Sequence, residues 1–169
     1  MGHVKNNSGN MEWYTPKIYI ESARKVMGTI DVDPASSREA NKIVLSSSYY
    51  TKDNSFLESN LPIEGNVWMN PPYKRGLIEK FVDKVILSFE EWSIDQAIIL
   101  TNNGTETKWG QKLLRNCDAV CFPSKRIRFL DESLQEANSP LQAQMFTYFG
   151  DNRDSFRDEF SQYGVVIFN

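Results

Sequence analysis

Histidine and cysteine are scarce in this sequence of 169 residues, and their scarcity excludes several kinds of chemistry. The only histidine, His3, stands in a polar N-terminal stretch that we expect to fray, which excludes a structured histidine base and a His-rich metal site. The two cysteines, Cys117 and Cys121, have no second pair beside them and match neither a zinc pattern nor a disulfide framework. We therefore expect no bound metal, and we interpret both cysteines as small buried residues.

Long apolar runs are missing as well. No run approaches the roughly 18 residues that a membrane-spanning helix needs, and the first ten residues are polar rather than signal-like. These absences predict a cytoplasmic protein with no membrane partner. Hydrophobic residues make up 40% of the chain, enough for one core, so we predict a frayed tail over residues 1–11 and a single domain over residues 12–169.

The net charge of -3 gives no general attraction to nucleic acid, but the charges are unevenly distributed. Residues 106–128 contain two acidic residues and six basic ones, namely Lys108, Lys112, Arg115, Lys125, Arg126 and Arg128. Residues 131–169 contain seven acidic residues and two basic ones. A polyanion is expected to meet the first segment and avoid the second. The alternative for the first three cations is a solvated helix face.

Apolar periodicity predicts an α/β fold. Helices are expected over residues 15–27, 37–45, 76–92 and 105–115, and strands over 29–32, 49–50, 65–69, 96–100, 119–122, 127–130, 144–149 and 164–168. Alternating strands and helices followed by a strand-rich end indicate a mainly parallel sheet with antiparallel strands at one edge. Such sheets bind ligands beyond the carboxyl ends of their strands.

The most specific feature is Asn70-Pro71-Pro72-Tyr73, which follows the strand over 65–69. Two prolines cannot continue a central strand, so the strand must end there. To methylate an amino nitrogen conjugated with a ring, an enzyme must draw its lone pair out of the ring by accepting hydrogen bonds from both N–H groups. The Asn70 side chain and the Pro71 backbone carbonyl can accept them, and the ring of Tyr73 can stack on a flipped-out base. This chemistry needs no acid, base or metal, and the alternative is an ordinary proline turn.

This tetrapeptide resembles the motif of class I amino-group methyltransferases that use S-adenosylmethionine. A wider set of residues, spread over 12–150, resembles the phage-type DNA N-6-adenine methyltransferase family. That set consists of Glu12 to Pro16, Asp31 to Ser36, Asn66 to Tyr73, Thr101 to Asn103, Thr107 to Trp109, Cys121 to Pro123 and Arg126 to Phe129. The resemblance implies a Rossmann-like fold, S-adenosylmethionine as methyl donor, the adenine amino group of double-stranded DNA as acceptor, and a phage-derived gene in a bacterial host.

The cofactor loop departs from the usual class I pattern. Those enzymes hold the methionine part of the cofactor with a Gly-rich loop after the first strand, which this chain lacks. Asp33-Pro34 can belong to a glycine-free version of it. We prefer a second interpretation, because the 36 residues between Asp33 and Asn70 are too few for two complete strand-helix units. Asp33, or Asp31, would then end the second strand and bind the ribose hydroxyls. A helix-capping aspartate is the alternative.

The resemblance implies further contacts. Tyr14, Thr15 and Pro16 would cover the methionine end of the cofactor, unless they only begin a helix, and Asn70 would border the cofactor as well as the target. Asp53 would contact the cofactor's adenine, with a plain turn as the alternative. The expected DNA contacts are Lys74, Arg75, Asn103, Lys108, Lys125, Arg126 and Arg128.

Two other functions remain open at this point. Methyltransferases for glutamine side chains and for ribosomal RNA carry the same tetrapeptide, because their targets are also conjugated amino groups. A DNA-binding module that has lost catalysis is less favoured, because Asn70 to Tyr73 is complete.

Overall fold

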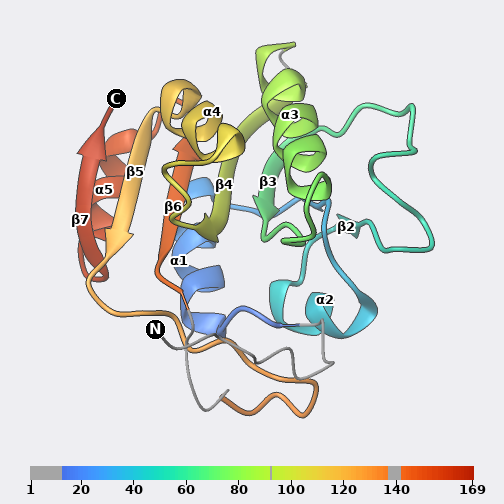
Figure 1. Ribbon diagram of the computed structural model, residues 1–169, viewed down its shortest axis with the longest axis horizontal. Coiled ribbons are helices and arrows are strands. Elements are labelled where there is room, and N and C mark those ends of the chain that lie inside the picture. The colour runs from blue at the N-terminus through green and yellow to red at the C-terminus, as the bar shows by residue number, and fades with distance from the viewer. Residues whose placement is uncertain (1–12, 92, 137–141) are drawn as a thin grey trace.

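The computed structural model describes residues 13–91, 93–136 and 142–169 (Figure 1). The predicted tail over 1–11 lies outside these residues. In the described part, seven strands form one sheet in the order β2-β1-β3-β4-β6-β5-β7. They are β1 (Val32–Asp33), β2 (Ser48–Tyr49), β3 (Gly65–Met69), β4 (Ile94–Asn102), β5 (Ala119–Pro123), β6 (Gln144–Phe149) and β7 (Gly164–Phe168).

Strand directions divide the sheet into two halves. Strands β2, β1, β3 and β4 pair in parallel, whereas β6 is antiparallel to both of its neighbours and β7 is antiparallel to β5. Five strands therefore run the same way, and the antiparallel pairs gather on one side. This confirms the predicted mixed α/β fold with antiparallel strands at one edge. The closer likeness to a Rossmann fold stays a prediction.

Five helices accompany the sheet in the described residues: α1 (Lys17–Met27), α2 (Arg38–Val44), α3 (Leu77–Glu90), α4 (Lys108–Asn116) and α5 (Arg153–Phe160). Side chains alternate between the faces of a strand, so Val67 and Met69 pack with α3 and α4 while Trp68 packs with α1 and α5. Asn70 continues the alternation on the α1 side. The motif thus begins between two apolar cores.

Local signals explain most element ends. Gly28 stops α1 with a φ of 86°, a conformation that glycine adopts readily. Ser37 and Thr107 cap α2 and α4, because their hydroxyls accept hydrogen bonds from the Ala40 and Gly110 N–H groups. The two cysteines are buried and unpaired, as interpreted above, and burial raises the pKa of both thiols to about 12.

One predicted strand does not form, and one helix was not predicted. Residues 127–130 form no strand, because the backbone N–H of the buried Ile127 donates to the Gln144 side chain at 3.0 Å. They contribute two isolated bridges, from Leu130 to Tyr14 and from Leu130 to Glu136. Helix α5 was not predicted because its sequence is mostly charged. Its signal is the pair Phe156 and Phe160, four residues apart and fully buried.

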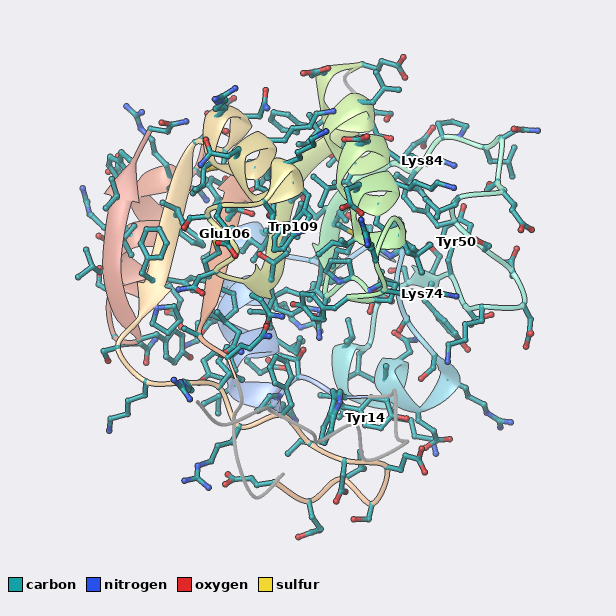
Figure 2. All side chains as sticks on the ribbon, in the orientation of Figure 1. Tyr14, Tyr50, Lys74, Lys84, Glu106 and Trp109 are labelled. Atoms are coloured by element: carbon teal, nitrogen blue, oxygen red, sulfur yellow. The ribbon has the colours of Figure 1, made fainter. Side chains whose placement is uncertain are left out.

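Residues 50–64 cross from β2 to β3 without a helix or strand. Lys84 of α3 binds the backbone of this loop, since its ammonium donates to the carbonyls of Phe56 and Ser59 and lies 4.4 Å from the centre of the Phe56 ring. The buried Phe56 ring also packs against Phe81 of α3, with ring centres 6.0 Å apart. Figure 2 shows Lys84 reaching from α3 toward the loop. A loop therefore occupies the space where a strand-helix unit would otherwise stand.

Candidate active site

The parallel strands bring their carboxyl ends to one edge of the sheet. Strand β1 ends at Asp33, β3 at Met69 just before Asn70, and β4 at Asn102. Figure 2 shows Tyr14 at the end of the molecule toward which the arrows of β3 and β4 point. Residues from four separate segments thus gather at the edge where such sheets bind ligands.

Asn70 is held from both sides of its amide. Its Nδ2 donates to the Thr15 hydroxyl at 3.3 Å, and its Oδ1 accepts from the Tyr73 hydroxyl at 3.4 Å. The side chain is partly buried, and Pro71 behind it is buried. Residues 55 positions apart in sequence, Thr15 and Asn70, therefore meet at the exit of β3.

Tyr73 has a buried hydroxyl end and an accessible ring. The residue keeps 41% of its surface exposed, while burial raises the pKa of its phenol and a hydrogen bond with the Asn102 backbone lowers it by less. The hydroxyl is protonated at neutral pH and can donate to Asn70. The exposed part of the ring is available for stacking.

Asp33 is the most buried carboxyl group at this edge, with 3% exposure. Its Oδ1 accepts the Ala35 N–H at 3.1 Å. Burial raises the pKa of Asp33 to about 7, and the hydrogen bonds from Ala35 and Ser36 reduce that rise only partly. The carboxyl group is therefore close to half-ionised at neutral pH, and hydroxyl donors would stabilise its charged form.

The preferred strand assignment for Asp33 was wrong. In the described residues β1 is the first strand, and it pairs directly with β3, Val32 opposite Val67, with no strand between them. The 36 residues between Asp33 and Asn70 do not hold two complete strand-helix units. They form α2, the short strand β2 that the sequence predicted, a loop over 50–64 and β3.

Asp31 lies apart from the other predicted cofactor residues. Its carboxylate accepts the Asn66 N–H at 2.8 Å, next to Gly65, where β3 begins. Asn70 follows the opposite end of this five-residue strand, roughly 15 Å away at about 3.3 Å per residue. The structure explains Asp31 as a support of the β1–β3 junction.

The Tyr14 segment is fixed against the segment that leaves β5. Tyr14 and Leu130 exchange two backbone hydrogen bonds, of 2.9 and 2.8 Å, and Tyr14 and Thr15 are both buried. A hollow of about 520 Å³ opens beside them. It is lined by Pro16, Ile18, Tyr19, Lys125, Arg126, Arg128 and Glu136. Three cations and one acid therefore surround a cavity one residue away from Thr15.

The remaining predicted residues fall into two groups. Lys74 and Arg75 are exposed just after the motif, and Asn103 and Lys108 are exposed between the end of β4 and the start of α4. Asp53 is exposed in the loop over 50–64, where its N–H donates to the Thr51 hydroxyl, so its turn role is explained locally. Lys112, part of the basic segment, pairs instead with Asp83 of α3 at 2.7 Å.

Two contributors to this edge were not predicted. The Asn102 backbone meets the Tyr73 hydroxyl, and the Gln144 side chain holds the segment that carries the three cations. A strand end is the only sequence signal for the first, and the second has none, because Gln144 begins a buried strand. Within the described residues, no group of three or more His, Cys, Asp or Glu is placed to hold a metal ion, and no helix is long and apolar enough to cross a membrane.

A partly buried amide thus lies at the exit of β3 with the Tyr73 hydroxyl bonded to it, and a buried carboxyl group ends β1 at the same edge of the sheet. A family model described as DNA N-6-adenine-methyltransferase (Dam) matches residues 2–161. The chain therefore belongs to this family, and the resemblance drawn from its motifs is confirmed. Membership implies methylation of DNA adenine as the general activity. Among curated proteins, no match to the chain is found.

Proposed function

We propose that this chain transfers a methyl group from S-adenosylmethionine to the N-6 amino group of adenine in double-stranded DNA. The observation that carries the proposal is the Asn70 amide at the end of β3, held by Thr15 and Tyr73 in a chain of the Dam family. An amide oxygen in this position can accept a hydrogen bond from a conjugated amino group. The reaction requires no acid, base or metal there.

Asn70 Oδ1 and the Pro71 carbonyl accept the two N–H groups of the target amine. Both accepted bonds localise the nitrogen lone pair, so the amine becomes a better nucleophile as its charge develops. Proline suits this position because it has no N–H and restricts the backbone that aims its carbonyl. Tyr73 offers its exposed ring to the base, a contact worth about 1–3 kcal/mol in single-strand binding.

Asp33 is the residue best suited to hold the cofactor. Bound S-adenosylmethionine would supply an electrophilic methyl group on sulfur, and its amino and hydroxyl groups would supply donors for a buried carboxylate. Asp33 has that carboxylate at the right sheet edge, with Pro34 buried beside it. Tyr14, Thr15 and Pro16 line the same edge and are proposed to exclude water from the methyl group. Asp53 remains a weaker candidate, because only its local turn supports it.

Two groups of residues are proposed to contact DNA. Lys125, Arg126 and Arg128 line the hollow next to Pro16, and these three are proposed to bind phosphates that flank the flipped adenine. The second group consists of Lys74, Arg75, Asn103 and Lys108. The second group directly follows the ends of β3 and β4, so a duplex bound by both groups would bring its bases close to Asn70.

A substrate comparison tests the proposal. The purified chain is incubated with radiolabelled S-adenosylmethionine and a random-sequence duplex library, and modified nucleosides are identified by mass spectrometry. We expect N-6-methyladenine, and no label in a library whose adenines are replaced by purine, which lacks the amino group. Labelling of RNA or of glutamine peptides in preference to duplex DNA would reject the proposed target, and failure to bind the cofactor in calorimetry would reject the enzyme.

A further inference from the structure

Thr15 stands between two fixed points of the backbone. Tyr14 before it is bonded to Leu130 by two backbone hydrogen bonds, and Pro16 after it begins α1. Thr15 itself is only 6% exposed. Its hydroxyl has little freedom to move relative to the end of β3.

The sequence predicts that a helix begins at Thr15, where a threonine hydroxyl commonly acts as a cap. The Thr15 hydroxyl does not cap α1 in the structure. No described side chain caps this helix, and the first turn is closed by the Tyr19 N–H donating to the Pro16 carbonyl. The hydroxyl instead accepts Nδ2 of Asn70. A residue that sequence assigns to helix formation is thus committed to the motif.

Asn70 needs such a partner because the last torsion of an asparagine is soft and allows its oxygen and nitrogen to exchange places. Only one of the two arrangements suits an amine. With Oδ1 toward the target, the amine N–H finds an acceptor. With Nδ2 there, two donors face each other. When Oδ1 accepts a hydrogen bond from the amine, Nδ2 must face Thr15. A partly buried N–H group without an acceptor there would cost free energy.

We propose that Thr15 is a positioning residue, whose Oγ1 orients the Asn70 carboxamide so that Oδ1 faces the target amine. This inference rests on the proposed function, and it replaces cofactor coverage as the main role of Thr15. Tyr73 supports the same orientation from the other side of the amide, because its hydroxyl accepts a hydrogen bond from the Asn102 backbone and donates its proton to Oδ1.

The test compares Thr15→Val, which keeps the shape and removes the acceptor, with Thr15→Ser, which keeps the hydroxyl. Single-turnover methyl transfer is measured at saturating duplex and S-adenosylmethionine. We expect Thr15→Val to be slower by about tenfold or more, because misorientation at a reacting centre is expensive, and Thr15→Ser to stay within about threefold of wild type. Binding of S-adenosylmethionine by calorimetry is expected to change less than about twofold in Thr15→Val, which also shows that the variant is folded.

Thr29→Val is a matched control. The Thr29 hydroxyl accepts an asparagine Nδ2 from the same strand, that of Asn66 at 2.9 Å, but at the opposite end. Its loss should leave the methyl-transfer rate unchanged. A rate loss in Thr29→Val as large as that in Thr15→Val would overturn the inference, since the effect would then come from loosening β3 as a whole.

A double-mutant cycle completes the test. In an Asn70→Ala background, Thr15→Val should cause no further loss, because its effect passes through the amide. Equal losses in both backgrounds, a wild-type rate in Thr15→Val, or a rate loss explained by weaker cofactor binding would each overturn the inference while the wild-type chain remains active. If the wild-type chain does not methylate adenine in DNA, the proposed function itself fails and the inference fails with it.

Discussion

The two ends of β3 carry similar side chains in different states of hydrogen bonding. At the amino end, Asn66 donates to Thr29 and to the Met27 carbonyl, both at 2.9 Å, and accepts from Gln96 at 3.3 Å, while Asp31 supports its backbone. At the carboxyl end, Asn70 has one contact to Thr15 and one long contact to Tyr73, and neither is shorter than 3.3 Å. At the amino end of β3, the hydrogen-bonding groups of these side chains are occupied. At the carboxyl end, they can still form a further contact.

The difference indicates that one end of β3 stabilises the fold while the other end is available to a ligand. A saturated amide stabilises the fold and has little capacity for a ligand, whereas an amide whose oxygen has only one long contact can accept a further hydrogen bond from a target. The two aspartates follow the same division. Asp31 is used within the protein, and Asp33 is buried with a raised pKa and few donors. Four variants test this comparison and the site around it.

Asn70→Ala should have the largest effect. Removing a preorganised acceptor from the reacting amine is expected to slow methyl transfer by about a hundredfold or more, while binding of S-adenosylmethionine stays within a few-fold. Rapid-quench assays and calorimetry measure the two quantities. Asn116→Ala, an exposed asparagine at the end of α4, is the control and should retain full turnover. Turnover of Asn70→Ala equal to that of wild type would remove the functional half of the comparison.

Asp33→Asn should weaken cofactor binding by about tenfold above neutral pH, the loss expected for one charged hydrogen bond. In wild type, binding should strengthen as the pH rises through about 7, because the carboxylate then ionises; in the variant this dependence should disappear. Calorimetric titrations from pH 6 to 8.5 follow both. A pH dependence that survives in Asp33→Asn would assign it to another group.

The same variant should be more stable than wild type at high pH. A carboxyl group whose pKa is raised by folding favours the folded state below its unfolded pKa of about 4, and this contribution is lost as the pH rises through about 7. The unfolding free energy of wild type should therefore fall across that window, while Asp33→Asn stays level. Urea unfolding at pH 5 and pH 8 separates the two. Parallel pH dependence in both proteins would contradict the buried carboxylate.

Arg126→Ala combined with Arg128→Ala should weaken DNA binding and reduce its salt dependence. Each lost phosphate contact removes about 0.9 from the slope of log affinity against log salt, so two remove nearly 2. Arg153→Ala with Arg157→Ala removes the same charge from α5 and should leave the slope unchanged. An unchanged slope with lower sequence selectivity would show that the first two arginines contact bases, each worth about 1–3 kcal/mol of discrimination.

Asn66→Ala should have the smallest effect on chemistry. The lost hydrogen bonds are expected to lower the unfolding free energy by about 1–2 kcal/mol, with the single-turnover rate of the folded protein unchanged. Urea unfolding and the methyl-transfer assay report the two. A slower rate at equal cofactor binding would mean that the amino end of β3 contributes to the site, and the comparison would have to be abandoned.

Sequence patterns predicted the parts of this molecule that are governed by local rules. Strand β3 could be placed because an apolar run meets two prolines, and α3 because its apolar residues recur at helical spacing. The family and the motif followed from the same residues. In contrast, α5 depends on two phenylalanines in a charged segment, and residues 127–130 failed to form a strand because a distant glutamine takes the Ile127 N–H.

The sequence predicted several residues that meet at this edge of the sheet, but not the contacts between them. Thr15 was named from its neighbours in sequence, yet its partner lies 55 residues away, and nothing local distinguishes a capping hydroxyl from one that binds an asparagine. Likewise, Asp31 and Asp33 are two positions apart and equivalent in type. Only the structure distinguishes them, because Asp31 accepts the Asn66 N–H near the start of β3 whereas Asp33 ends β1 on the other side of the Val32–Val67 pair.

The contacts of Lys84 have a consequence for local unfolding of the molecule. Residues 50–64 have no ladder of their own, and the hold of one ammonium group on the Phe56 and Ser59 carbonyls ties them to the middle of α3, whose first turn begins at the motif through the Lys74 carbonyl. Opening of this loop is therefore a local event that is coupled to one helix rather than to global unfolding. In hydrogen exchange, the amides of the loop should exchange at similar rates and faster than those of β3, because they share the contact with Lys84.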